Sequence, residues 1–188
     1  RNGSAPVIPG RKGPQGYKYF AIHKPVEHNG KDVLSVPPED RASGYLTVFD
    51  ILQEKTGEDP RGYYSLGRLD QDVDGLMILT NDPSMAVLLM GVTKCEKDYH
   101  VVAGGPIYDF DLKNLTEVGV DIPERNRVDD SWSVTNVKAV RAARSKDRRE
   151  LDLTIVEGKY HQVKLMIRAI GKRVRQLTRT GFAGIRLD

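Results

Sequence analysis

Residues 67–82 read GRLDQDVDGLMILTND, and the chain changes character sharply within this stretch. Asp70 lies near Arg68 in a polar segment, and Gly75 leads into the apolar run from Leu76 to Leu79. A short apolar run bounded by turn residues is typical of a buried strand. We therefore predict that a loop holds the Asp70 carboxylate directly before a buried strand, at the mouth of a cleft.

Around this strand, helical and strand patterns are interspersed. We expect strands at 17–22, 98–103, 133–140 and 151–155, and two short strands in the tail up to 187. We expect helices at 47–55, which Thr47 caps, and at 83–90, 109–118 and 163–170. In the third helix Leu112, Leu115 and Val118 should point inward. Because the strands do not follow a strict βαβ rhythm, the prediction is an α+β fold with a mixed or antiparallel sheet.

The segments outside these elements are polar and rich in turn residues. Residues 1–16 contain mostly Gly, Pro and charge, which predicts a flexible N-terminal arm. Residues 27–44 are predicted to form a long loop. We expect residues 17–188 to form one domain, with a possible division into two subdomains near 92–105.

Composition limits the classes of protein that fit. The 188 residues are 39% hydrophobic and 29% charged, as in an ordinary globular domain. No apolar run reaches the roughly 18 residues that a membrane span needs. Cys95 is the only cysteine, which excludes an intrachain disulfide and a cysteine-based zinc site. We expect a cytoplasmic monomer without a bound metal or cofactor.

Positive charge gathers in the last third of the chain, although the net charge is only +3. Between Gly158 and Leu187 there are eight Lys or Arg residues and no Asp or Glu. A second cluster of Lys and Arg occupies residues 138–149, with Asp147 as its only acid. This distribution predicts a surface that binds nucleic acid.

Two chemistries fit the Asp70 loop. In the first, Asp70, Asp72 and Asp74 occupy positions one, three and five of a calcium-binding loop of the EF-hand type. Position twelve would then be Asn81 instead of the required Glu, and the flanking segments do not read as helices. In the second, Asp70 is the catalytic carboxylate of an enzyme that acts on nucleic acid.

Four segments in order give the second reading a specific form. They are Ile22-His23-Lys24-Pro25, the 67–82 stretch, Lys97-Asp98-Tyr99-His100-Val101, and the segment 157–164, which reads EGKYHQVK. Together they resemble the motifs of pseudouridine synthases, and most closely those of the RsuA-type group, which modifies ribosomal RNA. The resemblance covers about residues 18–188. It departs from the family at Val73, where Thr or Ser is usual, and at Leu165-Met166-Ile167, where a more basic segment is usual.

The resemblance implies a bent, mainly antiparallel sheet flanked by helices, with a catalytic cleft across it. It also implies isomerisation of a uridine in ribosomal RNA, either a folded fragment or an assembling subunit, with no cofactor. Asp70 would be the catalytic group, supported by Arg68, Tyr99 and Lys164. The RNA would be bound by further residues along the chain, namely Lys24, Lys159, Gln162, Arg168, Arg173, Arg175 and Arg179. The alternative function on the same fold is an RNA-binding or ribosome-assembly protein without catalysis.

Overall fold

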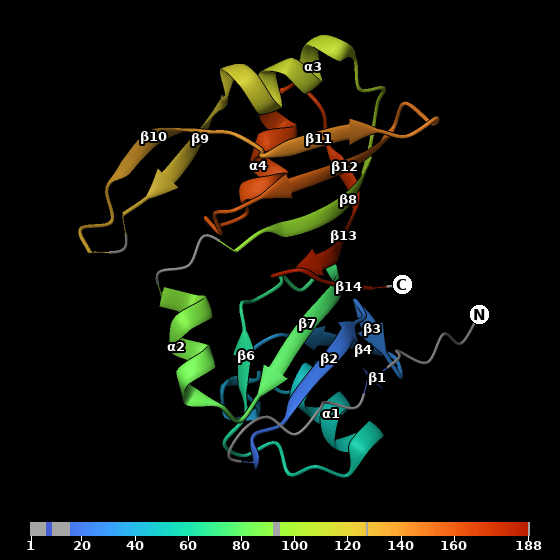
Figure 1. Cartoon of the computed structure of the whole chain (residues 1–188), viewed down its shortest axis with the longest axis vertical. Helices are drawn as coiled ribbons and strands as arrows, with labels where there is room; N and C mark the ends of the chain where they lie inside the picture. The colour runs from blue at the N-terminus through green and yellow to red at the C-terminus, as the bar shows by residue number, and fades with distance from the viewer. Residues whose placement is uncertain (1–6, 9–15, 92–94, 127, 188) are drawn as a thin grey trace. The chain divides into compact units, whose positions relative to one another are not determined.

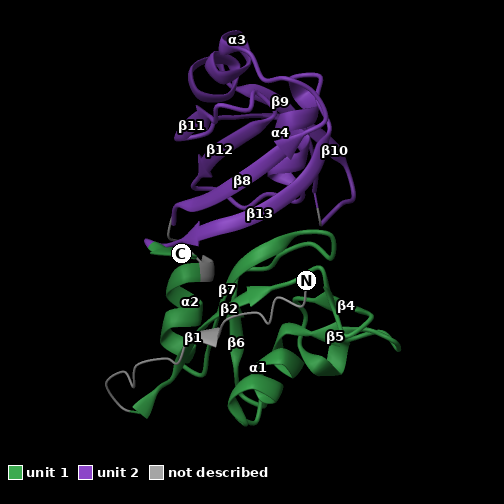
Figure 2. Cartoon of the chain, turned by 90° about the vertical axis from the view of Figure 1, so that its right-hand side faces the viewer, with its two compact units in different colours: residues 1–93, 185–188 green, residues 94–184 purple. Residues whose placement is uncertain are grey.

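The computed structural model describes residues 7–8, 16–91, 95–126 and 128–187 (Figure 1). The chain divides into two compact units, coloured separately in Figure 2. Unit 1 contains residues 1–93 and 185–188, and unit 2 contains residues 94–184. No helix among the described residues is long and apolar enough to span a membrane. Most of the predicted N-terminal arm lies outside the described residues, but residues 7–8 form a strand, β1.

The main strands of unit 1 pair antiparallel. β2 lies between β1 and β7, and β6 pairs with the end of β7. A small separate sheet contains β3, β4 and β5. The elements of unit 1 are β1 (Val7–Ile8), β2 (Tyr19–Lys24), β3 (Glu27–His28), β4 (Lys31–Leu34), the 3₁₀ helix η2 (Pro38–Asp40), β5 (Leu46–Thr47), α1 (Val48–Thr56), β6 (Tyr64–Leu66), β7 (Asp74–Thr80), α2 (Pro83–Gly91) and β14 (Ile185–Arg186).

Local sequence explains where the helices of unit 1 begin. Thr47 accepts a hydrogen bond from the Asp50 amide, and the Asp50 carboxylate accepts one from the Thr47 amide, a reciprocal cap that starts α1. Asp82 accepts hydrogen bonds from the amides of Ser84 and Met85 and so caps α2. Apolar side chains from α1, β2 and β7 form the core of this unit, among them Ile22, Phe49, Ile51, Leu52, Leu76, Met77 and Leu79.

Unit 2 contains a four-stranded sheet in the order β13-β8-β12-β11, with every pair antiparallel. A separate hairpin, β9 and β10, packs against α4. The elements of unit 2 are β8 (Lys97–Ala103), α3 (Asp109–Lys113), the π-helical turn η3 (Asn114–Val118), β9 (Val120–Arg125), β10 (Trp132–Val137), β11 (Arg141–Arg144), β12 (Glu150–Ile155), α4 (Gln162–Ala169) and β13 (Val174–Phe182). Its core includes Val101, Leu115, Leu151, Leu153, Met166 and Ile167.

The structure confirms the predicted α+β class and the mainly antiparallel pairing. Several details differ from the prediction. Residues 27–44 contain β3, β4 and η2. The tail contains two strands as predicted, but the first of them, β13, is nine residues long and only β14 is short. Val118 is 59% exposed, because the π-helical turn changes the helical spacing before it. Strand β9 was missed because Pro123 interrupts its pattern, as expected of an edge strand.

Candidate active site

The Asp70 loop is anchored by apolar side chains on both sides of the carboxylate. Leu69 is 7% exposed and Val73 is 2% exposed, whereas Asp70 between them is half-buried. Ser35 clamps the loop further, since its hydroxyl donates to the Leu69 carbonyl at 2.6 Å and accepts from the Leu69 amide at 3.2 Å. The Val73 amide also donates to the Asp70 carbonyl, which closes a tight turn. These contacts fix the backbone that carries Asp70.

Lys24 also anchors the Asp70 loop. Lys24 lies opposite Gly75 in the β2–β7 register, and its side chain is fully buried. Its ammonium group donates to the carbonyl oxygens of Pro25 at 3.2 Å, Gln71 at 3.1 Å and Val73 at 2.9 Å. An ammonium group has three donors, so these carbonyls use its whole capacity. Lys24 therefore ties the end of β2 to both sides of the turn after Asp70.

Burial also affects the charge of this lysine. Desolvation lowers the pKa of Lys24 to about 8, because a low-dielectric site disfavours the charged form. The carboxylates of Asp74, Asp72, Asp70 and Asp32 oppose this shift. The loop therefore supplies both the carbonyl partners and the negative charge that keep a buried ammonium group in place.

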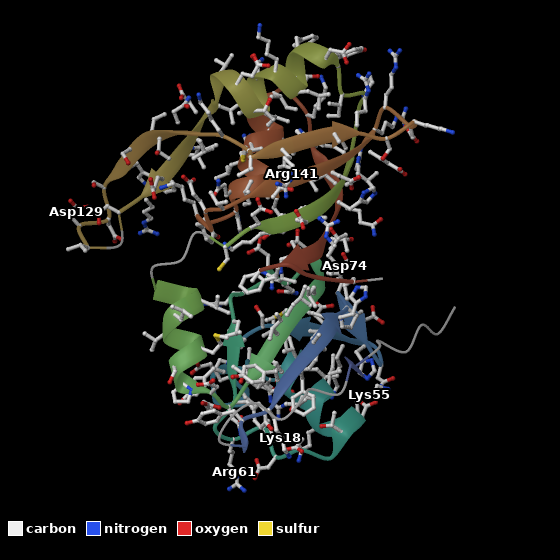
Figure 3. The ribbon with its side chains drawn as sticks, viewed as in Figure 1. Lys18, Lys55, Arg61, Asp74, Asp129 and Arg141 are labelled. Carbon is white, nitrogen blue, oxygen red and sulfur yellow. The ribbon has the colours of Figure 1, made fainter. Side chains whose placement is uncertain are left out.

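The acids of the loop do not form a calcium-binding loop. Strands β6 and β7 flank the loop where an EF-hand would have helices. Asp74 is the first residue of β7, and its carboxylate lies 3.7 Å from the His23 ring (Figure 3). Among the described residues, no group of three or more His, Cys, Asp or Glu side chains is placed to hold a metal ion. The calcium alternative has no support in this geometry.

In unit 2, Tyr99 and Arg179 lie opposite each other on two neighbouring strands. Tyr99 on β8 is 9% exposed and lies opposite Arg179 on β13, which is 1% exposed. The Arg179 guanidinium carbon lies 5.2 Å from the centre of the Phe182 ring. Burial lowers the pKa of Arg179, and its hydrogen bond with the Tyr99 side chain opposes that shift. Arg179 therefore lies beside Tyr99 on the neighbouring strand and interacts electrostatically with its side chain.

The segment before α4 is held by its own polar side chains. Gln162 is 3% exposed, accepts a hydrogen bond from the Lys159 amide at 3.0 Å and donates to the Glu157 carboxylate at 3.2 Å. The Lys159 ammonium group lies 2.7 Å from a Glu124 oxygen on β9. Lys164 is half-buried in the first turn of α4. Gln162 and Lys159 thus fix the turn from which Lys164 projects.

These contacts change part of the predicted RNA-binding set. Lys24, Gln162 and Arg179 are buried and interact with other groups of the protein, so we exclude all three from the RNA-binding surface. Arg168, Arg173 and Arg175 are exposed, and none of them forms an ion pair with another described residue. Arg68 is exposed in the Asp70 loop.

The sequence did not single out several residues of these surroundings. Ser35 lies in a segment that was predicted to be a loop, 34 residues from its partner Leu69. Tyr160 is 70% exposed and stacks on His161, with the ring centres 3.7 Å apart. The Glu-Gly-Lys-x-x-Gln motif surrounds this aromatic pair and was the only signal that could have drawn attention to it.

Comparisons with known proteins agree on one family. Residues 18–169 match the family described as RNA pseudouridylate synthase. The chain is 33% identical over 175 residues to ribosomal small subunit pseudouridine synthase A of Vibrio vulnificus, covering 93% of this chain and 67% of that protein. It is 31% identical over 170 residues to ribosomal large subunit pseudouridine synthase B of Bacillus subtilis, covering 90% of this chain and 63% of that protein.

A solved structure extends the match to three dimensions. The crystal structure of a pseudouridylate synthase superposes with a TM-score of 0.67 at 26% identity, covering 92% of this chain and 65% of that one. The chain thus spans about two thirds of the length of the proteins that it matches.

Proposed function

The chain belongs to the RNA pseudouridylate synthase family, and on that basis we propose that it isomerises a uridine of ribosomal RNA to pseudouridine, with Asp70 as the catalytic carboxylate. The observation that carries the proposal is the anchored Asp70 loop. Lys24, Ser35 and the buried side chains of Leu69 and Val73 fix its backbone on both sides of the carboxylate. A reacting group gains most from such pre-organisation, because small errors in position are costly in rate.

The reaction exchanges one bond of the base for another. The bond between N1 of uracil and the ribose is broken, the base turns, and a bond from C5 to the same ribose carbon replaces it. The hydrogen on C5 leaves and N1 gains a proton, so the product is an isomer of the substrate. The carboxylate of Asp70 acts on the nucleotide during bond breakage, and the rigid loop holds it in place.

The remaining residues have supporting roles in this proposal. Tyr99, which lies beside Arg179 on the neighbouring strand, stacks on the uracil after the nucleotide has left the RNA stack. Lys164 supplies positive charge at the site, and Arg68 binds a phosphate or holds the nucleotide extruded. Arg168, exposed on α4, binds the RNA backbone. Phosphate contacts of this kind give affinity and no sequence information.

The test is tritium release from ribosomal RNA labelled at C5 of uridine and transcribed without modifications. We expect release with the natural chain, and none with Asp70→Asn, which keeps the size of the side chain and removes its charge. Both subunits' RNA are needed as substrates, since the relatives include enzymes named for each. RNA binding by Asp70→Asn should persist.

Two outcomes contradict the proposal in different ways. Release by Asp70→Asn at the natural rate would remove Asp70 from the chemistry. Binding of RNA without release by the natural chain, on the RNA of both subunits, would favour a binding protein that has kept the fold.

A further inference from the structure

One end of the sheet in unit 2 brings three separate segments together. At the end of β8, the Ala103 amide donates to the Arg149 carbonyl at 2.8 Å and the Gly104 amide to the Arg173 carbonyl at 2.7 Å. The Ile107 amide donates to the Arg148 carbonyl at 2.7 Å. The turn between β11 and β12, the chain after β8, and the start of β13 are thus joined through their backbones (Figure 1).

The side chains of these joined segments form a basic edge. We define the basic edge as Lys146, Arg148, Arg149, Lys172, Arg173 and Arg175. All are exposed except Lys172, which is half-buried. Among the residues that the structure describes, none of the six has an ion-pair partner.

The acids nearby are already engaged or partly covered. Asp109 pairs with Arg144 at 3.0 Å, and the Asp147 carboxylate accepts a hydrogen bond from the Arg149 amide at 2.9 Å. Glu150 is half-buried at the start of β12. The six cations of the basic edge outnumber the Asp147 carboxylate that lies among them, so the edge is a surface of net positive charge.

Gly104 allows a cation to lie close to the backbone, whereas the contact at Gly105 is of ordinary length. A Cβ atom on Gly104 would come within 3.2 Å of the Arg175 Nε atom, and one on Gly105 within 3.6 Å of the Lys172 Cδ atom. The guanidinium group of Arg175 therefore lies close to the backbone at the bend after β8.

An exposed aromatic pair borders the basic edge. Tyr108 and Phe110 stack with their ring centres 5.6 Å apart and their planes at 9°. Tyr108 is 39% exposed and Phe110 is 62% exposed. The Lys172 ammonium group lies 5.6 Å from the centre of the Tyr108 ring. The buried Asp111 fixes the base of this pair, since its carboxylate accepts from the Tyr108 amide at 2.8 Å.

We propose that the basic edge and the aromatic pair bind a single-stranded segment of RNA that flanks the modified nucleotide. Unneutralised cations bind phosphates, and exposed aromatic rings give bases a surface on which to stack, the combination typical of single-strand binding surfaces. Ala103, whose amide donates to the Arg149 carbonyl of the basic edge, lies four residues after Tyr99 on the same strand. That separation is about 13 Å, so the edge is a second contact for the RNA, outside the site of reaction. The choice of this RNA segment as substrate rests on the proposed function.

Salt dependence of binding tests the electrostatic part. The probe is a fluorescent single-stranded RNA of about 12 nucleotides, within the length that one such surface binds. The variant is Arg148→Gln/Arg149→Gln/Arg173→Gln, in which the backbone carbonyls that join the segments are unchanged. Each phosphate contact on a single strand contributes about 0.7 to the magnitude of the slope of log K against log salt. Because the variant removes three cations, we expect the magnitude of the slope to fall by about 2 and the affinity to fall by roughly 50-fold at 0.15 M salt.

The matched control is Lys31→Gln/Lys55→Gln/Arg61→Gln in unit 1, which removes the same charge from exposed positions. We expect its slope to stay near that of the natural chain. If the salt slope fell equally in both variants, RNA binding would depend on net charge alone, and the proposal would be wrong. Unchanged RNA binding by the edge variant, with loss of binding to vesicles of anionic phospholipid, would assign the edge to a membrane surface and also overturn it.

Phe110→Ala tests the stacking part. We expect about tenfold weaker binding of the single strand and no change for a duplex of the same sequence. Equal weakening for both forms would contradict single-strand stacking. These assays measure binding alone, so they stand even if no RNA releases tritium. If the natural chain does release tritium, the edge variant should raise KM and leave kcat unchanged.

Discussion

The Asp70 loop and the basic edge use cations in opposite ways. At the Asp70 loop, Lys24 is fully buried and its donors are all taken by backbone carbonyls. At the basic edge, Arg148 and Arg149 are exposed and are joined to the fold through backbone groups. A positively charged side chain thus supports the fold in one region, whereas in the other such side chains form the proposed RNA-binding surface.

What separates the two regions is the set of partners that the fold brings near each cation. A buried charge is tolerated only where partners replace its lost hydration, so removing it should damage the site it supports. An exposed charge without a partner costs nothing to remove in the folded state, so its loss should affect only what binds there. The predictions below substitute one cation at a time, and each measurement tests which of these two outcomes follows.

The largest effect is expected for Lys24→Met. The substitution leaves the Gln71 and Val73 carbonyls without their donor, so the turn after Asp70 should relax. A shift of about 1 Å in a reacting group can cost about 100-fold in rate, which is the expected fall in tritium release. The unsatisfied carbonyls should also lower the free energy of unfolding, by about 2 kcal/mol. The loss stays this small because methionine removes the cost of burying a charged group.

Lys18→Met is the control for Lys24→Met. Lys18 is a partly exposed lysine of unit 1 that pairs with Glu58 (Figure 3). We expect nearly natural activity from it. A similar fall in tritium release for both variants would mean that Lys24 has no special part in holding the loop.

The sequence predicted best those elements of the fold that are indicated by hydrophobic patterns and by helix-capping residues. Thr47 and Asp82 begin helices as expected, and the apolar run before Thr80 is a buried strand. The length of β13 was not predictable in this way, because Gly181 interrupts its pattern. That glycine is required by a neighbour, since a Cβ atom there would lie 2.5 Å from a carboxylate oxygen of Asp98 on β8.

The buried cations show where prediction of the candidate site ended. Lys24 and Arg179 both read as surface charges, because the sequence around them does not reveal their partners. The carbonyls that bind Lys24 inside the loop lie 47 and 49 residues away, and the partner of Arg179 lies on a different strand. Asp70 was easier to find, since its motif is local and its anchors Leu69 and Val73 are its near neighbours in sequence.

A smaller effect is expected for Arg179→Lys. A lysine keeps the charge but loses the planar guanidinium group that lies beside Tyr99, so lysine and arginine are not interchangeable at such a site. We expect kcat for tritium release to fall about tenfold, the cost of one charge-assisted hydrogen bond. The affinity for RNA and its salt dependence should not change, because Arg179 is buried.

Tyr99→Phe sharpens this prediction by removing the hydroxyl instead. If Arg179 acts through Tyr99, the double variant should be no worse than the more impaired single variant. Fully additive losses would separate the two residues and leave Arg179 with a role in packing alone. A lower salt slope in Arg179→Lys would place it with the exposed cations instead.

The smallest effect is expected for Arg141→Gln, which tests a third kind of cation. Arg141 on β11 is exposed like the basic edge, yet its guanidinium group lies 3.0 and 2.6 Å from the two carboxylate oxygens of Glu96 and 3.8 Å from Asp98 (Figure 3). Exposed ion pairs add little to stability, so the midpoint of urea unfolding should not move measurably. The salt slope of RNA binding should also stay unchanged, because acids of the chain already neutralise this charge. A loss of slope as large as that per arginine of the basic edge would mean that exposure alone, and not the absence of an acidic partner, decides which cations bind RNA.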